Sequence, residues 1–196
     1  MANFVVEFPL KTEKYQEDIL NKRFEIGRQI YNSLVNITQK RYKELIKIKK
    51  YRTLLSSLTG NKKSDKEMIK TKKYRELTSS LTGNKKTDKE ILKQINDIRK
   101  QYGMSEYFFH KDVKMMQRHF KDNIDSFTAQ KIATALWKSY EKFFYGNGKK
   151  IYYKKYGSYN SFEGKSNSTG IRFKNDMIFW NGLEIPVVID YSNSYE

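Results

Sequence analysis

The segment from Ser126 to Lys174 constrains the fold most, because its pattern changes in kind partway along. Residues 126–146 read SFTAQKIATALWKSYEKFFYG, and their apolar side chains recur at spacings of three and four. That period places them on one face of an α-helix, which has to be buried against other parts of the protein. The residues on this face are Phe127, Ile132, Ala133, Leu136, Trp137, Tyr140, Phe143 and Phe144.

After Gly146 cationic residues alternate with aromatic ones, and Glu163 is the only acidic residue between Gly148 and Lys174. Cations beside flat rings suit a nucleic-acid backbone whose bases stack nearby. The alternative is a hairpin whose tyrosines pack on the preceding helix. We expect nucleic-acid contacts, and the predicted binding residues are Lys149, Lys150, Tyr152, Tyr153, Lys154, Lys155, Tyr156, Tyr159, Lys165, Arg172 and Lys174.

The charge of the chain favours an anionic partner. The 196 residues carry a formal net charge of +17, and such self-repulsion is relieved by nucleic acid or by an acidic membrane surface. Residues 38–100 hold 20 Lys and Arg against 7 Asp and Glu, a net charge of +13. This region therefore predicts a second basic face, made of Lys49, Lys50, Arg52, Lys62, Lys63, Lys72, Lys73, Arg75, Lys85 and Lys86.

An internal repeat lies within the same region. KKYRTLLSSLTGNKKSDKE at Lys49–Glu67 recurs as KKYRELTSSLTGNKKTDKE at Lys72–Glu90. Each copy ends a helix at a glycine suited to a left-handed C-cap and restarts one with a capping-box pattern. We expect a duplicated helical hairpin at 49–90 that lengthens a helical lobe.

Strand signals lie at the two ends of the chain. Residues 4–8 are β-prone, and Thr12 is placed to cap a long helix that we expect to run, with a bend, towards Leu58. The C-terminal strand signals are residues 171–173, 177–180 and 184–189, with hairpin turns at Asn175-Asp176 and Asn181-Gly182.

The N-terminal strand has no neighbour in sequence, so we expect it to join the C-terminal strands. The predicted fold is therefore α+β, with a helical lobe inserted into a small, incomplete antiparallel β-barrel module. Its predicted parts are residues 1–11 for the first strand, 12–147 for the helical recognition lobe and 148–196 for the remaining strands.

Groups that carry chemistry are sparse. His110 and His119 are nine residues apart, a poor spacing for a shared metal site on a helix, and Asp190 follows an apolar strand with no acidic cluster nearby. We expect no catalytic residue, no metal and no cofactor. The absence of cysteine excludes disulfides and fits an intracellular protein, and no stretch is long or apolar enough to span a bilayer.

Four stretches in this order resemble the N-terminal part of TnpB-like transposon-encoded proteins, the RNA-guided nucleases related to compact type V CRISPR effectors. They span nearly the whole chain except the repeat. The four stretches are FVVEFPLKTEKYQEDILNKRFEIGRQIYNSLV, SFTAQKIATALWKSYEKFFYGNGKKIYYKKYG, SYNSFEGKSNSTGIRF and FWNGLEIPV.

The resemblance implies a wedge-type β-barrel split by a recognition lobe, which together grip guide RNA, the guide–target duplex and adjacent DNA. The family continues with further barrel strands and a RuvC-like nuclease domain, and this sequence contains neither. We therefore expect a truncated or split transposase-related protein that binds RNA and DNA in the bacterial cytoplasm without cleaving them. A separate nuclease subunit is a candidate partner. The alternatives are a DNA-binding regulator without RNA and a protein-interaction module.

Overall fold

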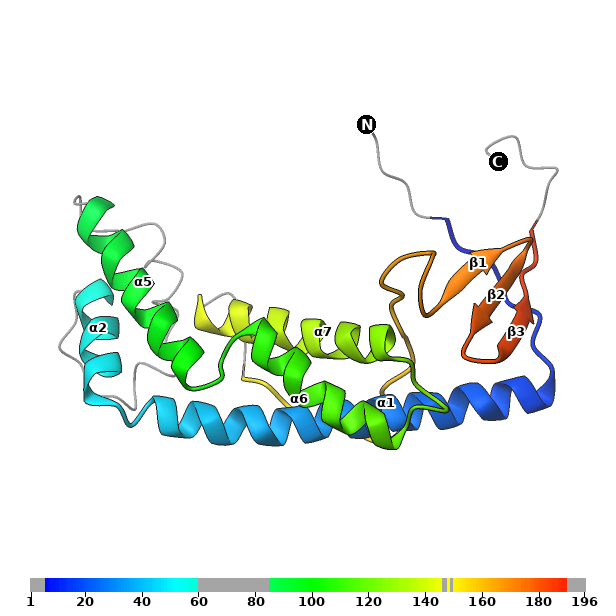
Figure 1. Ribbon diagram of the computed structural model, residues 1–196, viewed down its shortest axis with the longest axis horizontal. Helices are drawn as coiled ribbons and strands as arrows, with labels where there is room; N and C mark the ends of the chain where they lie inside the picture. Colours follow the sequence, from blue (N-terminus) through cyan, green and yellow to red (C-terminus); the bar gives the residue numbers. More distant parts are fainter. Residues whose placement is uncertain (1–5, 60–84, 146–147, 149, 190–196) are drawn as a thin grey trace.

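A single long helix, α1, carries the other elements of the described molecule (Figure 1). The computed structural model describes residues 6–59, 85–145, 148 and 150–189. Helices α6 and α7 lie along the middle of α1, an arm of α2 and α5 stands at one end, and a small sheet lies at the other (Figure 1). The elements are α1 (Lys14–Leu45), α2 (Lys49–Thr59), α5 (Lys85–Gln101), α6 (Glu106–His119), α7 (Ser126–Phe144), β1 (Arg172–Lys174), β2 (Met177–Trp180) and β3 (Leu183–Pro186).

Helix α1 spans 32 residues, which is about 48 Å at the usual rise per residue. A capping box formed by Glu13 and Gln16 starts it. The predicted cap at Thr12 is therefore wrong by one residue, and the Thr12 hydroxyl instead donates to a glutamate of the first turn. The helix ends at Leu45, and α2 begins after a short break. The helix expected to run towards Leu58 is thus two helices.

The hydrophobic core lies where α6 and α7 pack against α1. Leu34 of α1 and Leu136 of α7 are fully buried there. Phe109 of α6 meets Trp137 and Tyr140 of α7 edge to face, with ring centroids 5.5 and 5.6 Å apart. Burial raises the pKa of Tyr140 to about 12, because the charged phenolate is disfavoured away from water. The predicted apolar face of α7 is confirmed as a core face.

The arm of α2 and α5 is joined to this core through a buried arginine. Arg99 of α5 lies with its guanidinium 4.1 Å from the ring centroid of Phe144, and its Nε donates to the Tyr51 hydroxyl at 3.1 Å. Most of the predicted duplicated hairpin, residues 60–84, lies outside the described residues.

Both predicted hairpin turns are confirmed. The three strands form an antiparallel sheet in the order β1-β2-β3. Asn175 and Asp176 connect β1 to β2 with φ of 50° and 56°, and Asn181 and Gly182 connect β2 to β3 with φ of 46° and 78°. Two consecutive residues with positive φ match the right-handed twist of a hairpin, and short polar residues and glycine tolerate them best.

The sheet is open, which confirms the expected α+β class with an incomplete barrel. Phe173 pairs with Ile178, and Ile178 pairs with the buried Ile185 of β3. The N-terminal segment returns to the strands by an isolated antiparallel bridge between Leu10 and Val187. Residues 6–8, the described part of the β-prone stretch, are not a β-strand, and the backbone contact with β3 and the residues after it is made by Pro9, Leu10 and Lys11.

One arginine docks the sheet on α1. Arg23, which is 4% exposed, donates to the carbonyl oxygens of Trp180 and Asn181 at 2.7 and 2.8 Å, and its guanidinium covers the Trp180 ring. Burial lowers the pKa of Arg23. The Trp180 indole donates in turn to Asp125, the N-cap of α7. The sheet, α1 and α7 therefore meet at one polar junction.

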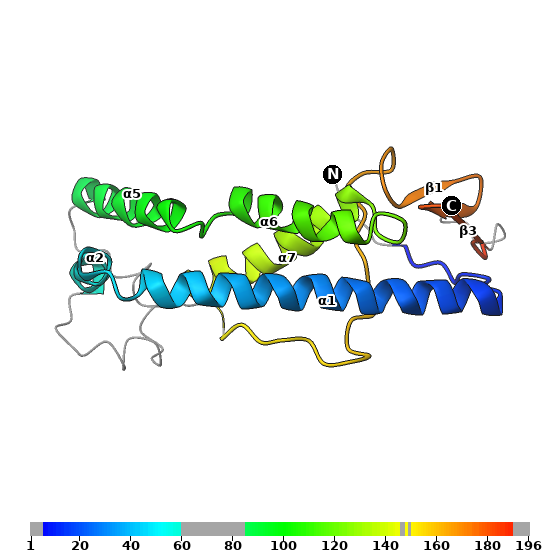
Figure 2. The same ribbon diagram turned by 60° about the horizontal axis from the view of Figure 1, so that its bottom comes forward.

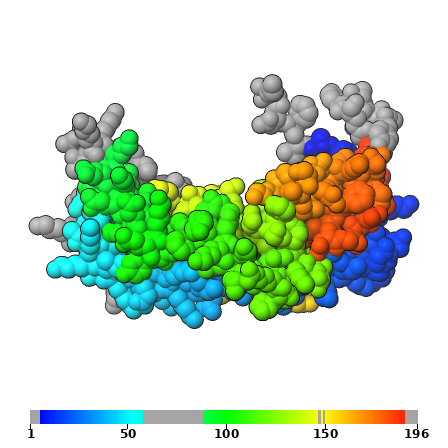
Figure 3. Space-filling view, viewed as in Figure 1, coloured from blue at the N-terminus to red at the C-terminus, as the bar shows by residue number. Residues whose placement is uncertain are grey.

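The outline of the molecule is hollowed between the α5 arm and the sheet (Figure 3).

Of the helices that the structure describes, none combines the length and the apolar character that a bilayer crossing requires.

Candidate nucleic-acid interface

Residues 150–163, here called the strap, run along α1 in the opposite direction to the helix (Figure 2). Gln39 donates to the Ile151 carbonyl oxygen at 3.1 Å, and Asn32, two turns earlier on α1, bonds to Lys154. Phe162 then reaches Gly27, more than one turn earlier again. The strap has no secondary structure of its own, so side chains of α1 hold it in place.

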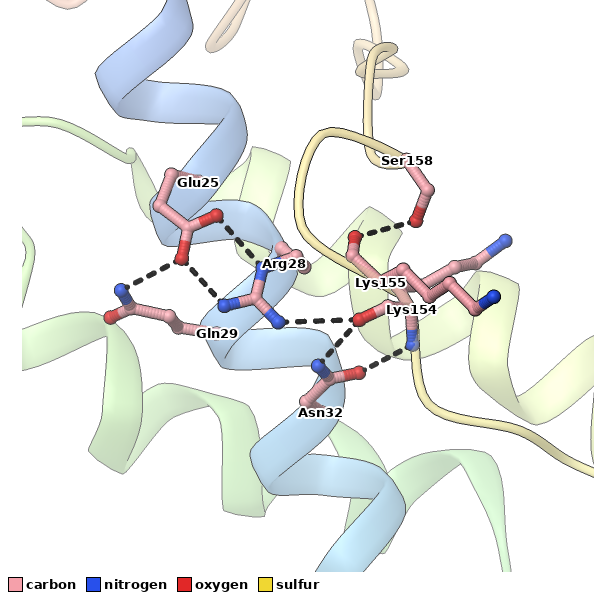
Figure 4. A network of polar contacts seen from close by, with 7 residues as sticks. All are labelled: Glu25, Arg28, Gln29, Asn32, Lys154, Lys155 and Ser158. Atoms are coloured by element: carbon pink, nitrogen blue, oxygen red, sulfur yellow. Dashed lines mark hydrogen bonds and ion pairs between the residues drawn. The ribbon is translucent and has the colours of Figure 1, made fainter.

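The centre of the strap is fixed at one peptide unit. The Asn32 side chain donates to the Lys154 carbonyl oxygen at 3.0 Å and accepts from the Lys154 amide at 2.8 Å (Figure 4). Arg28 donates to the same carbonyl oxygen at 3.2 Å and is itself held by Glu25. The hydrogen bond from Arg28 lowers the pKa of Glu25. With the backbone bound to α1, the side chains of Lys154 and Lys155 extend away from the helix (Figure 4).

Two aromatic rings anchor the far end of the strap. Phe162 stacks on Phe24 of α1, with ring centroids 5.3 Å apart and planes at 9°. Its ring occupies the space beside Gly27, where an added Cβ would lie 2.6 Å from it. Tyr159 packs against Phe162 at 5.5 Å and against Tyr31 at 6.3 Å. These rings form part of the packing with the core and are not free to stack on bases.

The remaining rings of the strap face solvent. Tyr152, Tyr153 and Tyr156 are 65%, 51% and 84% exposed. Lys154 and Lys155 are exposed between them, and Lys150 precedes them with its Nζ 5.9 Å from the Tyr152 ring. These three lysines form no ion pair with any residue that the structure describes. Flat rings and unneutralised cations on a fixed backbone can stack bases and bind phosphates.

A cavity of about 340 Å³ lies between the strap and α7. Lys154, Ser158 and Tyr159 line it from the strap, and Tyr31 lines it from α1. At its rim Lys131 of α7 forms an ion pair with Glu163, whose side chain is mostly exposed. The one acidic residue of the strap is thus neutralised by a lysine from another element.

The predicted binding residues divide among several places. Lys165 donates to the Gln130 side chain at 3.0 Å and lies over the Phe127 ring. Arg172 and Lys174 are exposed on β1, which lies on the other side of α1 from the strap (Figures 1 and 2). Lys149 lies outside the described residues. The strap thus brings together only the residues from Lys150 to Tyr156, and Tyr159 belongs to the anchor.

Little of the predicted second basic face can be placed. Lys49 and Lys50 are exposed at the start of α2, and Arg52 is half-buried one turn further on. Lys62, Lys63, Lys72, Lys73 and Arg75 lie outside the described residues, and the side chains of Lys85 and Lys86 are not described.

Neither histidine belongs to a cluster of metal-ligating side chains among the described residues. His110 Nε2 lies 2.8 Å from Thr134 Oγ1, and that hydroxyl donates to Glu106, so the group links α6 to α7. His119 is exposed at the end of α6. Among the described residues no three His, Cys, Asp or Glu side chains gather so as to hold a metal ion, and Asp190 lies outside them.

Sequence reasoning missed the residues that position the strap. Gly27, Arg28, Asn32 and Gln39 all lie on α1, for which the sequence predicted a long helix and no binding role. The available signal was the glycine, because an interior helix glycine costs about 1 kcal/mol relative to alanine and marks a close approach. Comparisons of this chain with protein families, with curated proteins and with solved structures found no match.

Proposed function

We propose that the chain binds nucleic acid and is the gripping, non-cleaving part of a TnpB-like RNA-guided system. Its first partner would be a structured, guide-like RNA, its second DNA, and a separate nuclease subunit would supply cleavage. The site of action would be the bacterial cytoplasm, on the nucleoid when bound. The observation that carries this proposal is the strap, whose backbone is bonded to α1 while its lysines and three of its tyrosines face solvent.

A polyanion suits the strap better than a protein surface does. Lys150, Lys154 and Lys155 lie within six residues of one another and have no acidic partner among the described residues. Three such cations close together repel one another unless an anionic ligand lies across them. The exposed rings between them suit bases, because every base has a face on which a ring can stack.

The arrangement of elements is the second support. A helical lobe between an N-terminal segment and an open C-terminal sheet is what the TnpB-like resemblance implies. Proteins of that kind recognise nucleic acid through shape and charge, whereas base pairing supplies sequence specificity. The exposed lysines and tyrosines of the strap lie on a segment without secondary structure, which suits recognition of shape and charge more than recognition of a base sequence.

The proposal is tested by the salt dependence of RNA binding in a triple variant. K150A/K154A/K155A should bind a structured RNA more weakly than the parent protein, because three phosphate contacts are lost. Its slope of log affinity against log salt should be shallower by about 2 to 3, since each contact contributes about 0.7 to 0.9. Fluorescence anisotropy across a salt series measures both quantities.

The matched control is K111A/K114A/K121A, which removes the same charge from exposed lysines on α6 and the turn after it. It should change the slope much less, because α6 lies on the other side of α1 from the strap (Figure 2). Equal effects of the two triple variants would mean that net charge, and not the strap, governs binding. Absence of RNA affinity at low salt would reject the proposal, and a preference for duplex DNA would favour the DNA-binding regulator.

A further inference from the structure

The cavity beside the strap carries polar groups that the fold does not use. The hydroxyls of Tyr31 and Tyr159 make no hydrogen bond to any described residue, and neither is a fully buried atom left without a partner. Both hydroxyls therefore reach accessible space, and both tyrosines line the cavity. A tyrosine hydroxyl is protonated at neutral pH and can donate as well as accept, and burial raises the pKa of both side chains further.

The walls of the cavity combine three kinds of contact. The rings of Tyr31 and Tyr159 are tilted by 48° to one another, and Ile132 and Ala135 of α7 add apolar surface. Lys154 places its ammonium group 5.7 Å from the Tyr31 ring centroid. Because Lys131 is paired with Glu163, Lys154 is the cation of the lining without an ion pair to a described residue.

The size of the cavity limits what it can hold. A volume of about 340 Å³ is at the lower end of the range typical of small-ligand pockets. It is sufficient for one base with its sugar. Hydrogen-bonding groups, apolar surface and a nearby cation are contacts through which proteins hold bases that are splayed out of a strand.

We propose that this cavity receives a single unpaired nucleotide of the strand bound along the strap. The base contacts the hydroxyls of the two tyrosines and the apolar wall of α7, and Lys154 binds its phosphate. The inference rests on the proposed function and narrows it, because the preferred ligand becomes RNA with an unpaired nucleotide at one position. Lys154 belongs both to the strap and to the cavity, so the bound strand passes directly from one to the other.

The test compares two RNA hairpins that differ only in one bulged nucleotide, which is a fluorescent base analogue. The parent protein should bind the bulged hairpin about tenfold more tightly, within the range that one or two additional hydrogen bonds supply. A135W places an indole at the cavity wall from an exposed position of α7 and should abolish that preference. M115W, at an exposed position of α6 outside the cavity, is the control and should retain it.

A second variant covers the case in which A135W does not fold. Y31F/Y159F keeps both rings and removes only the hydroxyls, and should reduce the preference for the bulged hairpin about threefold to tenfold. The analogue's fluorescence should change on binding to the parent protein and not on binding to A135W.

The outcomes separate this inference from the proposed function. If both hairpins bind equally well to the parent protein, or if folded A135W keeps the preference, the cavity does not hold a nucleotide and the strap proposal stands. If neither hairpin binds at low salt, both proposals fail. A preference lost in A135W, reduced in Y31F/Y159F and kept in M115W supports the cavity.

Discussion

At the scale of single residues, Gly27 is the clearest case of a residue whose identity is explained by a contact with a distant part of the chain. It lies inside α1, where glycine normally weakens a helix by about 1 kcal/mol. A Cβ added at Gly27 would lie only 2.6 Å from the Phe162 ring, which is too close for an ordinary contact. Glycine at this position therefore leaves room for the Phe162 ring of the strap to pack on α1, although it weakens the helix.

This interpretation predicts that the destabilisation caused by G27A depends on the residue at position 162. In the parent protein G27A should lower the free energy of unfolding by about 1 to 3 kcal/mol, as overpacking does. In an F162L background the two closest ring atoms are gone and only the Tyr159 ring remains, 3.0 Å from the added Cβ. There the same change should lower the free energy of unfolding by less than in the parent protein. Urea unfolding of the four proteins measures the cycle, and destabilisation of equal size in both backgrounds would contradict it.

The division of the tyrosines could not be predicted at this scale. Tyr152, Tyr153, Tyr156 and Tyr159 all stand in one basic, aromatic run, yet only Tyr159 turns inward. The spacing of rings in a segment without regular structure does not say which of them faces a helix. That choice depends on Gly27 and its neighbours, more than a hundred residues earlier in the chain.

At the scale of elements, local signals were sufficient for the two hairpin turns and for the buried face of α7. Asn175-Asp176 and Asn181-Gly182 have the residue types that positive φ requires, and the apolar period of α7 identified its buried face. The strap gave no such signal. Its conformation depends on hydrogen bonds from α1, and a polar residue such as Asn32 is indistinguishable in sequence from ordinary helix surface.

Because Asn32 holds the strap on α1, we expect that a variant lacking this side chain loses affinity for RNA although its charge is unchanged. N32A removes both hydrogen bonds to the Lys154 backbone, so RNA would have to order the strap on binding. We expect a cost of about 1 kcal/mol, or roughly a fivefold loss of affinity. The salt slope should not change, because no cation is removed.

The control for this prediction is N36A, one turn further along α1 at an exposed position. It makes the same chemical change inside the same helix and should leave affinity unaltered. Fluorescence anisotropy with one RNA serves for both variants. An N36A protein that loses as much affinity as N32A would show that the effect comes from the helix and not from the strap.

At the scale of the whole molecule, α1 separates two surfaces. The strap lies on one side of it, and β1 with Arg172 and Lys174 lies on the other (Figures 1 and 2). The outline is also hollowed between the α5 arm and the sheet (Figure 3). The sequence predicted one continuous binding tail, and the structure divides it because the chain crosses α1 after Phe162. The α+β class itself was predictable, since strand and helix signals occupy separate regions.

The central claim is that RNA lies along the strap, and photo-crosslinking tests it most directly. The parent protein would be irradiated with bound RNA, and the crosslinked residues would be mapped by mass spectrometry. We predict crosslinks at Tyr152, Tyr153 and Tyr156, which are the exposed rings of the strap. Crosslinks confined to Phe173 of β1 or to the helices on the other side of α1, with none in the strap, would contradict the account.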